Sequence, residues 1–525
     1  MRSARGLFLC ILSGLLLILA FPRSNYWILA WVGFVPLFLA IEKKSKTKAF
    51  LLCYFAGVIF WLGTIYWLVH VTLPGMILLV LYLALYFGLF GLIIAGLGLR
   101  IQSLGFLVIP AIWVLLEYTR SHLLTGFPWA LLGYSQYLNL PAIQIVDITG
   151  AWGVSFLIMM VNILIYRVIK IAMSKDLPPS QPNRGRDPAC SFGTLGGKIS
   201  KIEKINIIFA ILILIFSFSY GYYRINGQRA NGQTEKTIRI SVIQGNIPQE
   251  LKWEPSAREF IMDKYLTLSA EAIRVRPDFI IWPEAAVPVP LEESSDYYER
   301  LISFVKETNI PILLGAVTAR DNLYYNSALL LSEDPGAIKK YDKLHLVPFG
   351  EYIPLRNLLR FLETVVPIGD FAPGERYTLF KIPGFPLPGP GSFAVLICFE
   401  DIFPELAQRF VREGAGLLVN ITNDAWFKQT SSPYQHLSAS VFRAVENRVF
   451  LVRAANTGIS GFIQPDGMII SRVQDKAGRE IFVEGYKTDE ITPLKKATTF
   501  YTRFGDIFIL VCIFVFFYAT ILRFL

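Results

Sequence analysis

The chain carries two different hydrophobic patterns, which separate its two ends from its middle. Long, nearly uncharged apolar runs fill the first 225 residues and the last 20, whereas positions 235–495 have the pattern of a soluble protein. A helix needs about 20 mainly apolar residues to cross a bilayer. Runs that reach or approach this length are 7–22, 26–41, 49–70, 75–98, 104–118, 152–172, 205–223 and 506–523. The pattern predicts a polytopic α-helical membrane protein with about eight transmembrane helices.

The middle region alternates short, β-branched apolar runs with segments of helical spacing. Runs typical of strands are Ile238–Ile243, Phe279–Trp282, Ile312–Ala316, Ser327–Leu331, Phe393–Cys398, Leu417–Ile421 and Phe450–Ala454. Helical spacing covers Ser256–Ala272, Tyr297–Thr308, Glu405–Glu413 and Gln435–Asn447. This alternation indicates an α/β domain in which helices cover sheets and functional side chains follow strand ends.

Composition and charge agree with a chain that lies partly in a bilayer. The 525 residues are 54% hydrophobic and 17% charged, with a mean hydropathy of +0.47, which is too apolar for one soluble globule. The net charge of +10 is compatible with nucleic-acid binding, but the basic residues cluster in short loops between apolar runs. Membrane topology explains them, so no nucleic-acid partner is expected. We expect a seven-span domain at 1–224, a catalytic domain at 225–495 and a C-terminal transmembrane helix at 496–525.

The basic loops also predict the orientation of the spans. If the N-terminus is cytoplasmic, most basic residues, including those of 43–48 and 173–204, lie inside, and the short outside loops hold only Arg23 and Arg120. Because Lys and Arg accumulate in cytoplasmic loops, we expect the middle domain on the extracytoplasmic side. The stretch 173–204, rich in Pro and Gly, is interpreted as a flexible linker, and the first apolar run as a retained anchor.

Three residues of the middle region have the positions that a cysteine nucleophile and its partners need. Cys398 ends an apolar run, and the carboxylates of Glu400 and Asp401 follow almost at once, so the chain leaves the core there. Glu284 follows another such run and precedes an apolar wall, and Lys343 precedes a rigid apolar stretch. A set of Glu284, Lys343 and Cys398 would perform acyl transfer through a thioester.

Each of the three also has a structural explanation. A cysteine is often simply buried, a glutamate after Trp-Pro is usually solvated, and Lys343 continues a run of charges with Lys339 and Lys340. The remaining cysteines lie in apolar runs or in a loop and predict no disulfide framework; they are Cys10, Cys53, Cys190 and Cys512. Ionisable residues are nearly absent from the spans, apart from His70 and Glu117 near span ends, which disfavours a transporter.

With their flanking residues, these positions resemble a known family. The segments Trp282-Pro283-Glu284, Lys343–Pro354 and Cys398-Phe399-Glu400 are similar to the three signatures of the nitrilase, or carbon–nitrogen hydrolase, superfamily. Membrane spans around such a domain point to the apolipoprotein N-acyltransferase branch. Further stretches resemble that branch, namely Gln244–Gln249 with Trp253, Gly126–Trp129 with Gly133–Gln136, and Thr422–Trp426. One departure is Lys428, where the family pattern has glycine after Trp426-Phe427.

The resemblance covers nearly the whole chain and implies a fold, a reaction and substrates. The fold is an αββα sandwich on a membrane domain in the bacterial inner membrane, facing the periplasm. Glu284 deprotonates Cys398, whose thiolate takes an acyl chain from a phospholipid, and Lys343 stabilises the oxyanion with a main-chain N–H near Phe399. The acceptor is the α-amine of diacylglyceryl-cysteine on an apolipoprotein, and neither cofactor nor metal is implied.

The resemblance also implies supporting residues. Glu351 and Glu400 orient Lys343 and the acceptor amine, and Trp253 and Trp426 support substrate binding. Two alternatives remain open at this stage. One is a membrane-tethered amidase or nitrilase that uses water as acceptor, and the other is a membrane receptor or transporter with an inactive nitrilase-like domain. In addition, aromatic residues of the loop 119–151, such as Phe127 and Trp129, form either a substrate gate or an ordinary membrane-interface belt.

Overall fold

The computed structural model of the chain divides into two compact units. It describes residues 2–97, 105–175, 201–231, 237–287, 289–290, 295–332, 338–352, 371–387, 391–493 and 498–524. The helical unit comprises Met1–Arg224 with Asp506–Leu525, and the sheet unit comprises Ile225–Gly505. Most of the linker predicted at 173–204 lies outside the described residues.

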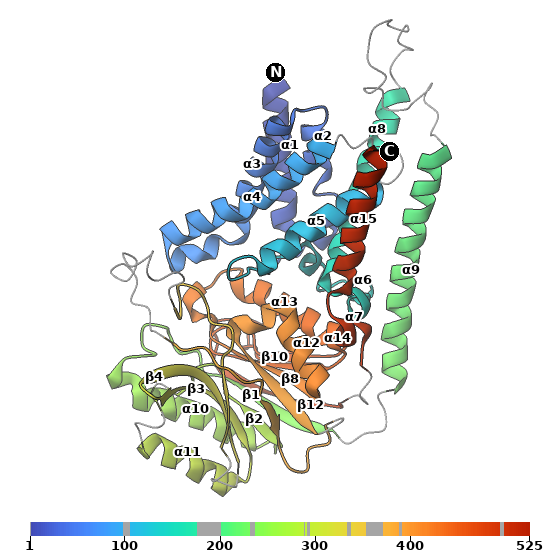
Figure 1. Cartoon of the computed structure of the whole chain (residues 1–525). Helices are drawn as coiled ribbons and strands as arrows, with labels where there is room; N and C mark the ends of the chain where they lie inside the picture. The colour runs from blue at the N-terminus through green and yellow to red at the C-terminus, as the bar shows by residue number, and fades with distance from the viewer. Residues whose placement is uncertain are drawn as a thin grey trace, which may run out of the picture. The chain divides into compact units, whose positions relative to one another are not determined.

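The helical unit is built from apolar helices and short connecting turns (Figure 1). Its longer helices are α1 (Arg2–Ala20), α3 (Lys46–Thr64), α4 (Leu73–Leu97), α5 (Gly105–His122), α8 (Ala151–Lys175), α9 (Lys201–Asn231), which continues past the unit's boundary, and α15 (Ile507–Phe524). Shorter elements are η1 (Trp27–Trp31), α2 (Val35–Ile41), η2 (Tyr66–His70), η3 (Leu132–Gln136), α6 (Leu140–Ile143) and α7 (Val146–Thr149).

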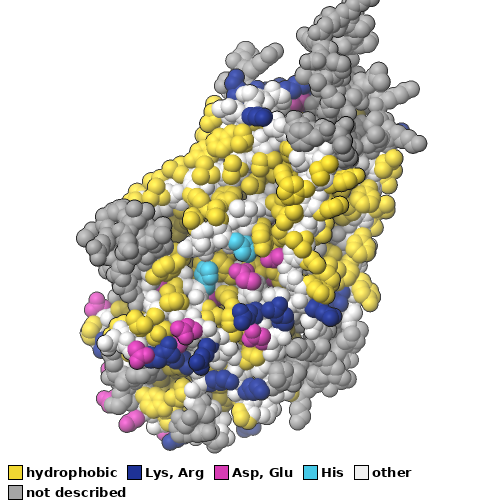
Figure 2. Space-filling model, in the orientation of Figure 1, with side chains coloured by type: hydrophobic (Ala, Val, Ile, Leu, Met, Phe, Trp, Pro, Cys, Tyr) yellow, Lys and Arg dark blue, Asp and Glu magenta, His cyan; other side chains and the backbone are white. Residues whose placement is uncertain are grey.

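Among the described residues, four helices are long and apolar enough to cross a membrane. They are Lys46–Thr64, Leu73–Leu97, Ala151–Met173 and Lys204–Gly227. Shorter apolar helices occupy Ala4–Ala20 and Ile507–Ile521, and α5 contains Pro110 within its length. The prediction of a membrane protein is supported, but eight spans are not confirmed. Hydrophobic side chains gather over the helices of this unit in Figure 2, and Leu78 of α4 is 69% exposed and Phe216 of α9 62%.

The span predicted at 26–41 is two short helices, η1 and α2, and two side chains explain how the break is tolerated. Asn162 of α8 donates from Nδ2 to the main-chain oxygen of Ala30 at 2.8 Å, and its Oδ1 accepts from the main-chain nitrogen of Phe34 at 2.8 Å. In an apolar environment, main-chain groups freed by a helix break need such polar partners. Ser13 Oγ also donates to the main-chain oxygen of Gly33 at 2.6 Å, so Asn162 and Ser13 together satisfy main-chain groups of the broken segment.

The sheet unit contains two six-stranded mixed sheets. The first runs β12-β1-β2-β3-β4-β5 and comprises β12 (Gly485–Ile491), β1 (Ile238–Gln244), β2 (Phe279–Ile281), β3 (Ile312–Arg320), β4 (Leu323–Leu331) and β5 (Lys339–Asp342). The second runs β11-β10-β9-β8-β7-β6 and comprises β11 (Ile469–Arg472), β10 (Gly461–Ile463), β9 (Phe450–Ala455), β8 (Ala415–Thr422), β7 (Ser392–Ile397) and β6 (Leu379–Lys381). Each sheet has a parallel centre, β1-β2-β3 in one and β7-β8-β9 in the other.

Helices flank the sheets and the two sheets pack on each other (Figure 1). Helix α10 (Arg258–Ile273) and α11 (Ser295–Thr308) share a hydrophobic core with β2 and β3. Helices α12 (Pro404–Glu413) and α13 (Ser432–Asn447) pack on strands of the second sheet. Phe279 of β2 meets Phe393 of β7 between the sheets, with ring centroids 5.4 Å apart. All seven predicted strands and four predicted helices are confirmed, with ends that shift by a few residues.

Candidate active site

The three residues predicted to perform the chemistry each follow a strand of the sheet unit. Glu284 comes just after β2, Lys343 directly after β5, and Cys398 directly after β7. Lys343 Nζ lies 3.5 Å from Glu284 Oε1, and both groups act electrostatically on the Cys398 thiol. The fold therefore brings together residues from both sheets that are up to 114 positions apart (398 − 284).

Cys398 has an unusual backbone conformation that the strand end imposes. It is the first residue of a short helix, η9 (Cys398–Ile402), and its φ is +52°, a value that side-chain-bearing residues seldom adopt. Its carbonyl oxygen accepts a hydrogen bond from Asn420 Nδ2 at 3.2 Å. Strained residues of this kind persist where the surrounding structure holds them, and they gather at functional sites.

The environment of Cys398 favours the neutral thiol over the thiolate. Burial raises the pKa of the Cys398 thiol, the Glu284 carboxylate raises it further, and the ammonium of Lys343 lowers it by less. A thiol of this kind is a poor nucleophile at neutral pH unless a neighbouring base accepts its proton. Glu284 is buried beside Lys343 and is the base that the geometry offers.

Lys343 is held between two carboxylates. Its Nζ lies 2.9 Å from Glu351 Oε2 as well as 3.5 Å from Glu284 Oε1, and its side chain is 1% exposed. Burial alone would lower the pKa of Lys343, but the carboxylates of Glu351 and Glu284 outweigh it and raise that pKa. Lys343 therefore remains a cation inside the site, as an oxyanion-stabilising group must.

An asparagine joins the two carboxylates. Asn326 Nδ2 donates to Glu284 Oε1 and to Glu351 Oε1, each at 2.7 Å. The remaining oxygen of Glu351, Oε2, accepts from the main-chain nitrogen of Val347 at 2.7 Å. The Glu284 loop also lies against Gly315 of β3, where a Cβ would come within 2.6 Å of the Glu284 Cα, so a side chain there would displace the base.

Glu400 has a different arrangement from Glu351. Its Oε1 accepts from the main-chain nitrogens of Leu344 at 2.7 Å and His345 at 3.1 Å, and its Oε2 from that of Ile397 at 2.8 Å. Tyr341 Oη donates to the same carboxylate at 2.8 Å. Burial raises the pKa of Glu400 to about 7, even though these donors oppose the shift. Glu400 thus ties the main chain beside Lys343 to the main chain before Cys398.

Comparisons with known proteins agree with this geometry. A family model described as the N-terminal domain of apolipoprotein N-acyltransferase matches residues 13–164, and one described as carbon–nitrogen hydrolase matches residues 239–485. The apolipoprotein N-acyltransferase of Geobacter metallireducens is 38% identical, over 97% of this chain and 93% of that protein. The chain belongs to the apolipoprotein N-acyltransferase family. The predicted family, and the prediction that the chain is an N-acyltransferase, are therefore confirmed.

More distant relatives carry the same name. The apolipoprotein N-acyltransferase of Methylococcus capsulatus is 31% identical over 96% of this chain and 93% of that protein, and that of Pasteurella multocida is 28% identical over 95% and 92%. Among solved structures, an amidase from Nesterenkonia sp. is 19% identical with a TM-score of 0.37, covering 51% of this chain and 92% of that one. The family assignment rests on the family models and the relatives, not on that amidase.

The family motifs around Trp253 and Trp426 lie on two loops that are joined to each other. Asn423 Nδ2 donates to Gln249 Oε1 at 2.8 Å. Trp253 and Trp426 are 45% and 47% exposed, so both indoles remain available for contacts beyond the sheet unit's core. Lys428 adopts a φ of +52°, which explains why the family pattern has glycine at this position.

Several buried polar residues of the site were missed by the sequence reasoning. Lys252 is 2% exposed, and its Nζ donates to the main-chain oxygen of Glu284 at 2.9 Å. Asn326 and Tyr341, described above, were also missed, because single polar residues within or beside strands carry no motif. Lys252 had a weak signal, since it stands directly before Trp253 in a motif that the family resemblance included.

A buried charge network lies behind the nucleophile and was also missed. His436 of α13 contacts Asp401 Oδ1 at 2.8 Å through Nε2 and Asp424 Oδ1 at 3.0 Å through Nδ1. Arg453 of β9 lies 3.1 Å from Asp401 and 3.2 Å from Asp424. His436 Nε2 also lies 3.2 Å from the Cys398 carbonyl oxygen, so the network supports the strand end that carries the thiol.

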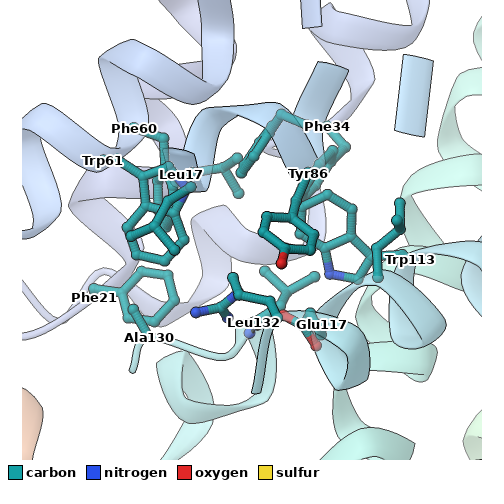
Figure 3. A pocket seen from close by; sticks show the side chains of 14 residues that line it. Leu17, Phe21, Phe34, Phe60, Trp61, Tyr86, Trp113, Glu117, Ala130 and Leu132 are labelled. Atoms are coloured by element: carbon teal, nitrogen blue, oxygen red, sulfur yellow. Dashed lines mark hydrogen bonds between the residues drawn. The ribbon is translucent and has the colours of Figure 1, made fainter. Parts of the chain in front are cut away.

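The segment 119–151, predicted to be a loop, is packed within the helical unit. Trp129, Tyr134 and Tyr137 are all buried. Glu117 and Arg120 of α5 line an aromatic cavity next to this segment; Figure 3 shows Glu117 beside Trp113, Tyr86 and Leu132. In the described residues of both units, no cluster of three or more His, Cys, Asp or Glu side chains is suited to a metal ion.

Proposed function

We propose that this chain transfers an acyl chain from a membrane phospholipid to the α-amine of diacylglyceryl-cysteine at the start of an apolipoprotein, through a thioester on Cys398. The observation that carries the proposal is the buried cluster of Glu284, Lys343 and Glu351 beside a thiol at a strained strand end. The family of the chain supports the two substrates, and its apolar helices support a bilayer as their source.

In the first half-reaction, Glu284 accepts the proton of the Cys398 thiol and the thiolate attacks the ester carbonyl of the phospholipid. The negative charge that forms on the carbonyl oxygen is stabilised by Lys343, which the two carboxylates keep protonated. We assign the second oxyanion donor to the main-chain N–H near Phe399, in the first turn of η9. The intermediate collapses, the lysophospholipid alkoxide leaves with the proton from Glu284, and an acyl thioester remains.

In the second half-reaction, the lipoprotein amine attacks the thioester and Glu284 accepts the proton that the nitrogen loses. The C–S bond breaks, the thiolate is protonated again, and an amide is formed. A thioester suits this step because amines attack it more readily than they attack an oxygen ester. Glu351 and Glu400 act as positioning residues, the first by contact with Lys343 and the second through the main chain.

The proposed substrates also suggest a cellular location and separate functions for the parts of the chain. We propose the bacterial inner membrane, with the sheet unit on the periplasmic side, where lipoproteins carry their diacylglyceryl group. We assign membrane spanning to residues 1–224 and 496–525, and catalysis to 225–495, with Trp253 and Trp426 contacting substrate. A reporter fused near residue 300 should behave as periplasmic, and one fused at 176–200 as cytoplasmic; cytoplasmic behaviour of the former would refute the orientation.

The thioester is tested by labelling. Protein incubated with acyl-labelled phospholipid and no lipopeptide should hold label that neutral hydroxylamine releases, and a diacylated lipopeptide should discharge the label into a triacylated product. Cys398→Ala should hold none, whereas Cys512→Ala, a matched control in the helical unit, should behave as wild type. Acyl transfer by Cys398→Ala would refute the thioester. Release of free fatty acid without a triacylated product would indicate water as the acceptor and hence an amidase-like hydrolase.

A further inference from the structure

Lys252 is a buried cation at the site that the reaction described above does not use. It lies on the loop between β1 and α10, is 2% exposed, and its Nζ donates to the main-chain oxygen of Glu284 at 2.9 Å. The next residue, Trp253, is 45% exposed, so the chain turns the lysine inward and the indole outward. Buried lysines are rare unless a partner compensates the cost of burial, so the burial of Lys252 indicates a specific role.

The charges of the site suggest a role for Lys252. Glu284 and Glu351 are two buried carboxylates around one lysine, Lys343, which leaves an excess of one negative charge if they are counted alone. An excess of buried negative charge opposes the formation of a thiolate nearby. Lys252 brings the count to zero, because it adds one positive charge within reach of Glu284 and Cys398.

Of the acidic residues behind Cys398, Asp424 also raises the pKa of the thiol, but by less than Glu284 does. Asp401 and Asp424 are paired with Arg453 and His436 in a network of their own. The carboxylate of Glu400 is engaged by main-chain N–H groups and by Tyr341. The titratable groups that act on Lys252 itself are Glu284 and Cys398.

We infer that Lys252 is a second cation of the catalytic centre, a positioning residue that fixes the main chain of Glu284 and offsets its charge so that the Cys398 thiolate can form. The inference rests on the proposed function, because it assumes that Cys398 is the nucleophile. Burial lowers the pKa of Lys252 to about 8, and Glu284 and Cys398 oppose that shift. Lys252 is therefore mainly protonated at pH 7 and loses its charge as the pH rises through about 8.

The test measures the reactivity of the thiol directly. The full-length protein in detergent is treated with iodoacetamide between pH 6 and pH 10, and alkylation is quantified on the peptide that carries Cys398. In wild type, the logarithm of the rate should rise with pH and then rise less steeply above about 8, where Lys252 becomes neutral. Lys252→Met should alkylate about tenfold more slowly at pH 7, which corresponds to a rise of one unit in the thiol pKa, and should lack the change of slope.

Two further variants separate charge from packing. Lys252→Arg keeps the charge and should recover most of the wild-type rate at pH 7. Lys264→Met is the control, because Lys264 is a half-buried lysine of the same unit that pairs with Glu484, 2.6 Å away, and not with the main chain of Glu284. It should leave the alkylation profile unchanged, and melting temperatures identify any variant that is misfolded.

The outcomes distinguish this inference from the function on which it rests. A Lys252→Met profile that coincides with wild type, or a wild-type profile without a change of slope near pH 8, would overturn the inference. The second result needs no variant, so the inference stays testable even if Lys252→Met does not fold. If instead Cys398→Ala still forms a triacylated product, the thioester itself is wrong, whatever Lys252 does.

Discussion

Each unit contains a cluster of buried charged side chains, and the two clusters differ in their partners. In the helical unit the charged groups bind main-chain atoms, and in the sheet unit they bind one lysine. In the helical unit, Glu117 Oε1 accepts from the main-chain nitrogen of Leu132 at 2.7 Å, and Arg120 donates to the main-chain oxygens of Phe127 at 2.6 Å and Trp129 at 2.8 Å. In the sheet unit, Lys343 contacts both Glu284 and Glu351.

The first cluster holds the fold of the helical unit, whereas in the proposed mechanism the second cluster moves a proton. A charged group whose oxygens or nitrogens bind main-chain groups holds a loop in place. Charged groups that share a lysine and adjoin a thiol can exchange a proton with little rearrangement. Glu400 belongs to the first kind although it lies in the sheet unit, because its donors include three main-chain nitrogens.

The largest effect is expected where a proton has to move. Glu284→Gln removes the base but keeps an oxygen for Asn326, so the fold should persist while formation of the labelled acyl-enzyme slows by about 10²–10⁴-fold. Glu351→Gln is the matched variant, since it also faces Asn326 and Lys343 but takes no proton in the proposed steps. It should be less impaired than Glu284→Gln in single-turnover acylation. Equal rates for Glu284→Gln and wild type would contradict the assignment of the base.

An intermediate effect is expected for Glu400, which holds main chain on both sides of the site. Glu400→Gln places an amide N–H group against N–H donors, so acyl-enzyme formation should slow by about tenfold, the cost of roughly one lost hydrogen bond. Tyr341→Phe, which removes only one of the donors, is the milder control. If Glu400→Gln lost as much activity as Glu284→Gln, Glu400 would belong with the proton-moving groups.

The pKa of Glu400 provides a second test, of stability against pH. Because burial raises the pKa of the folded state to about 7, the unfolded chain loses this proton at a lower pH than the folded chain does. The contribution of Glu400 to stability is therefore complete at low pH and declines as the pH rises towards about 7. The melting temperature of wild type, relative to Glu400→Gln, should fall between pH 5 and pH 7. A constant difference over this range would refute the raised pKa.

A smaller effect on catalysis is expected in the helical unit. Glu117→Ala leaves the main-chain N–H of Leu132 without its acceptor and should lower stability by about 1–3 kcal/mol. Glu117→Gln keeps an acceptor oxygen and should cost less. Both variants are measured by thermal melting in detergent and by single-turnover acylation. Acylation by Glu117→Gln should stay within about threefold of wild type, a change below 1 kcal/mol, and a loss as large as that of Glu284→Gln would erase the distinction between the clusters.

The smallest effect is expected at the departure from the family pattern. Lys428→Gly removes the Cβ from a residue whose φ is +52°, and the loss of this steric strain should raise stability by at most about 1 kcal/mol. Lys428→Ala also removes the exposed contact with Glu250, 3.6 Å away, but keeps the Cβ and so should not stabilise the protein. A stabilisation by Lys428→Ala as large as that by Lys428→Gly would show that the lysine side chain, not the backbone conformation, is responsible.

The sequence predicted the central strands well and the edges poorly. Runs such as 279–281 and 393–397 are buried on both faces, so they are continuously apolar and visible in the pattern. The edge strands β5, β6 and β12 contain charged residues, and β12 is only partly buried, so no periodic signal marks them. The broken span at 26–41 had the composition of a helix, and contacts with Ser13 and Asn162, which are distant in the sequence, stabilise the break.

By itself, the sequence predicted which residues carry the chemistry, because Glu284, Lys343 and Cys398 each follow a strand within a family motif. Only the tertiary structure decided what surrounds them. Asn326, Lys252 and His436 reach the site from a strand, a loop and a helix, and of the three only Lys252, beside Trp253, carries a weak signal in its immediate sequence. The physical reason is that a nucleophile and its base need a position at a strand end, which is a local property. The balance of buried charge, in contrast, depends on every side chain that the fold brings near.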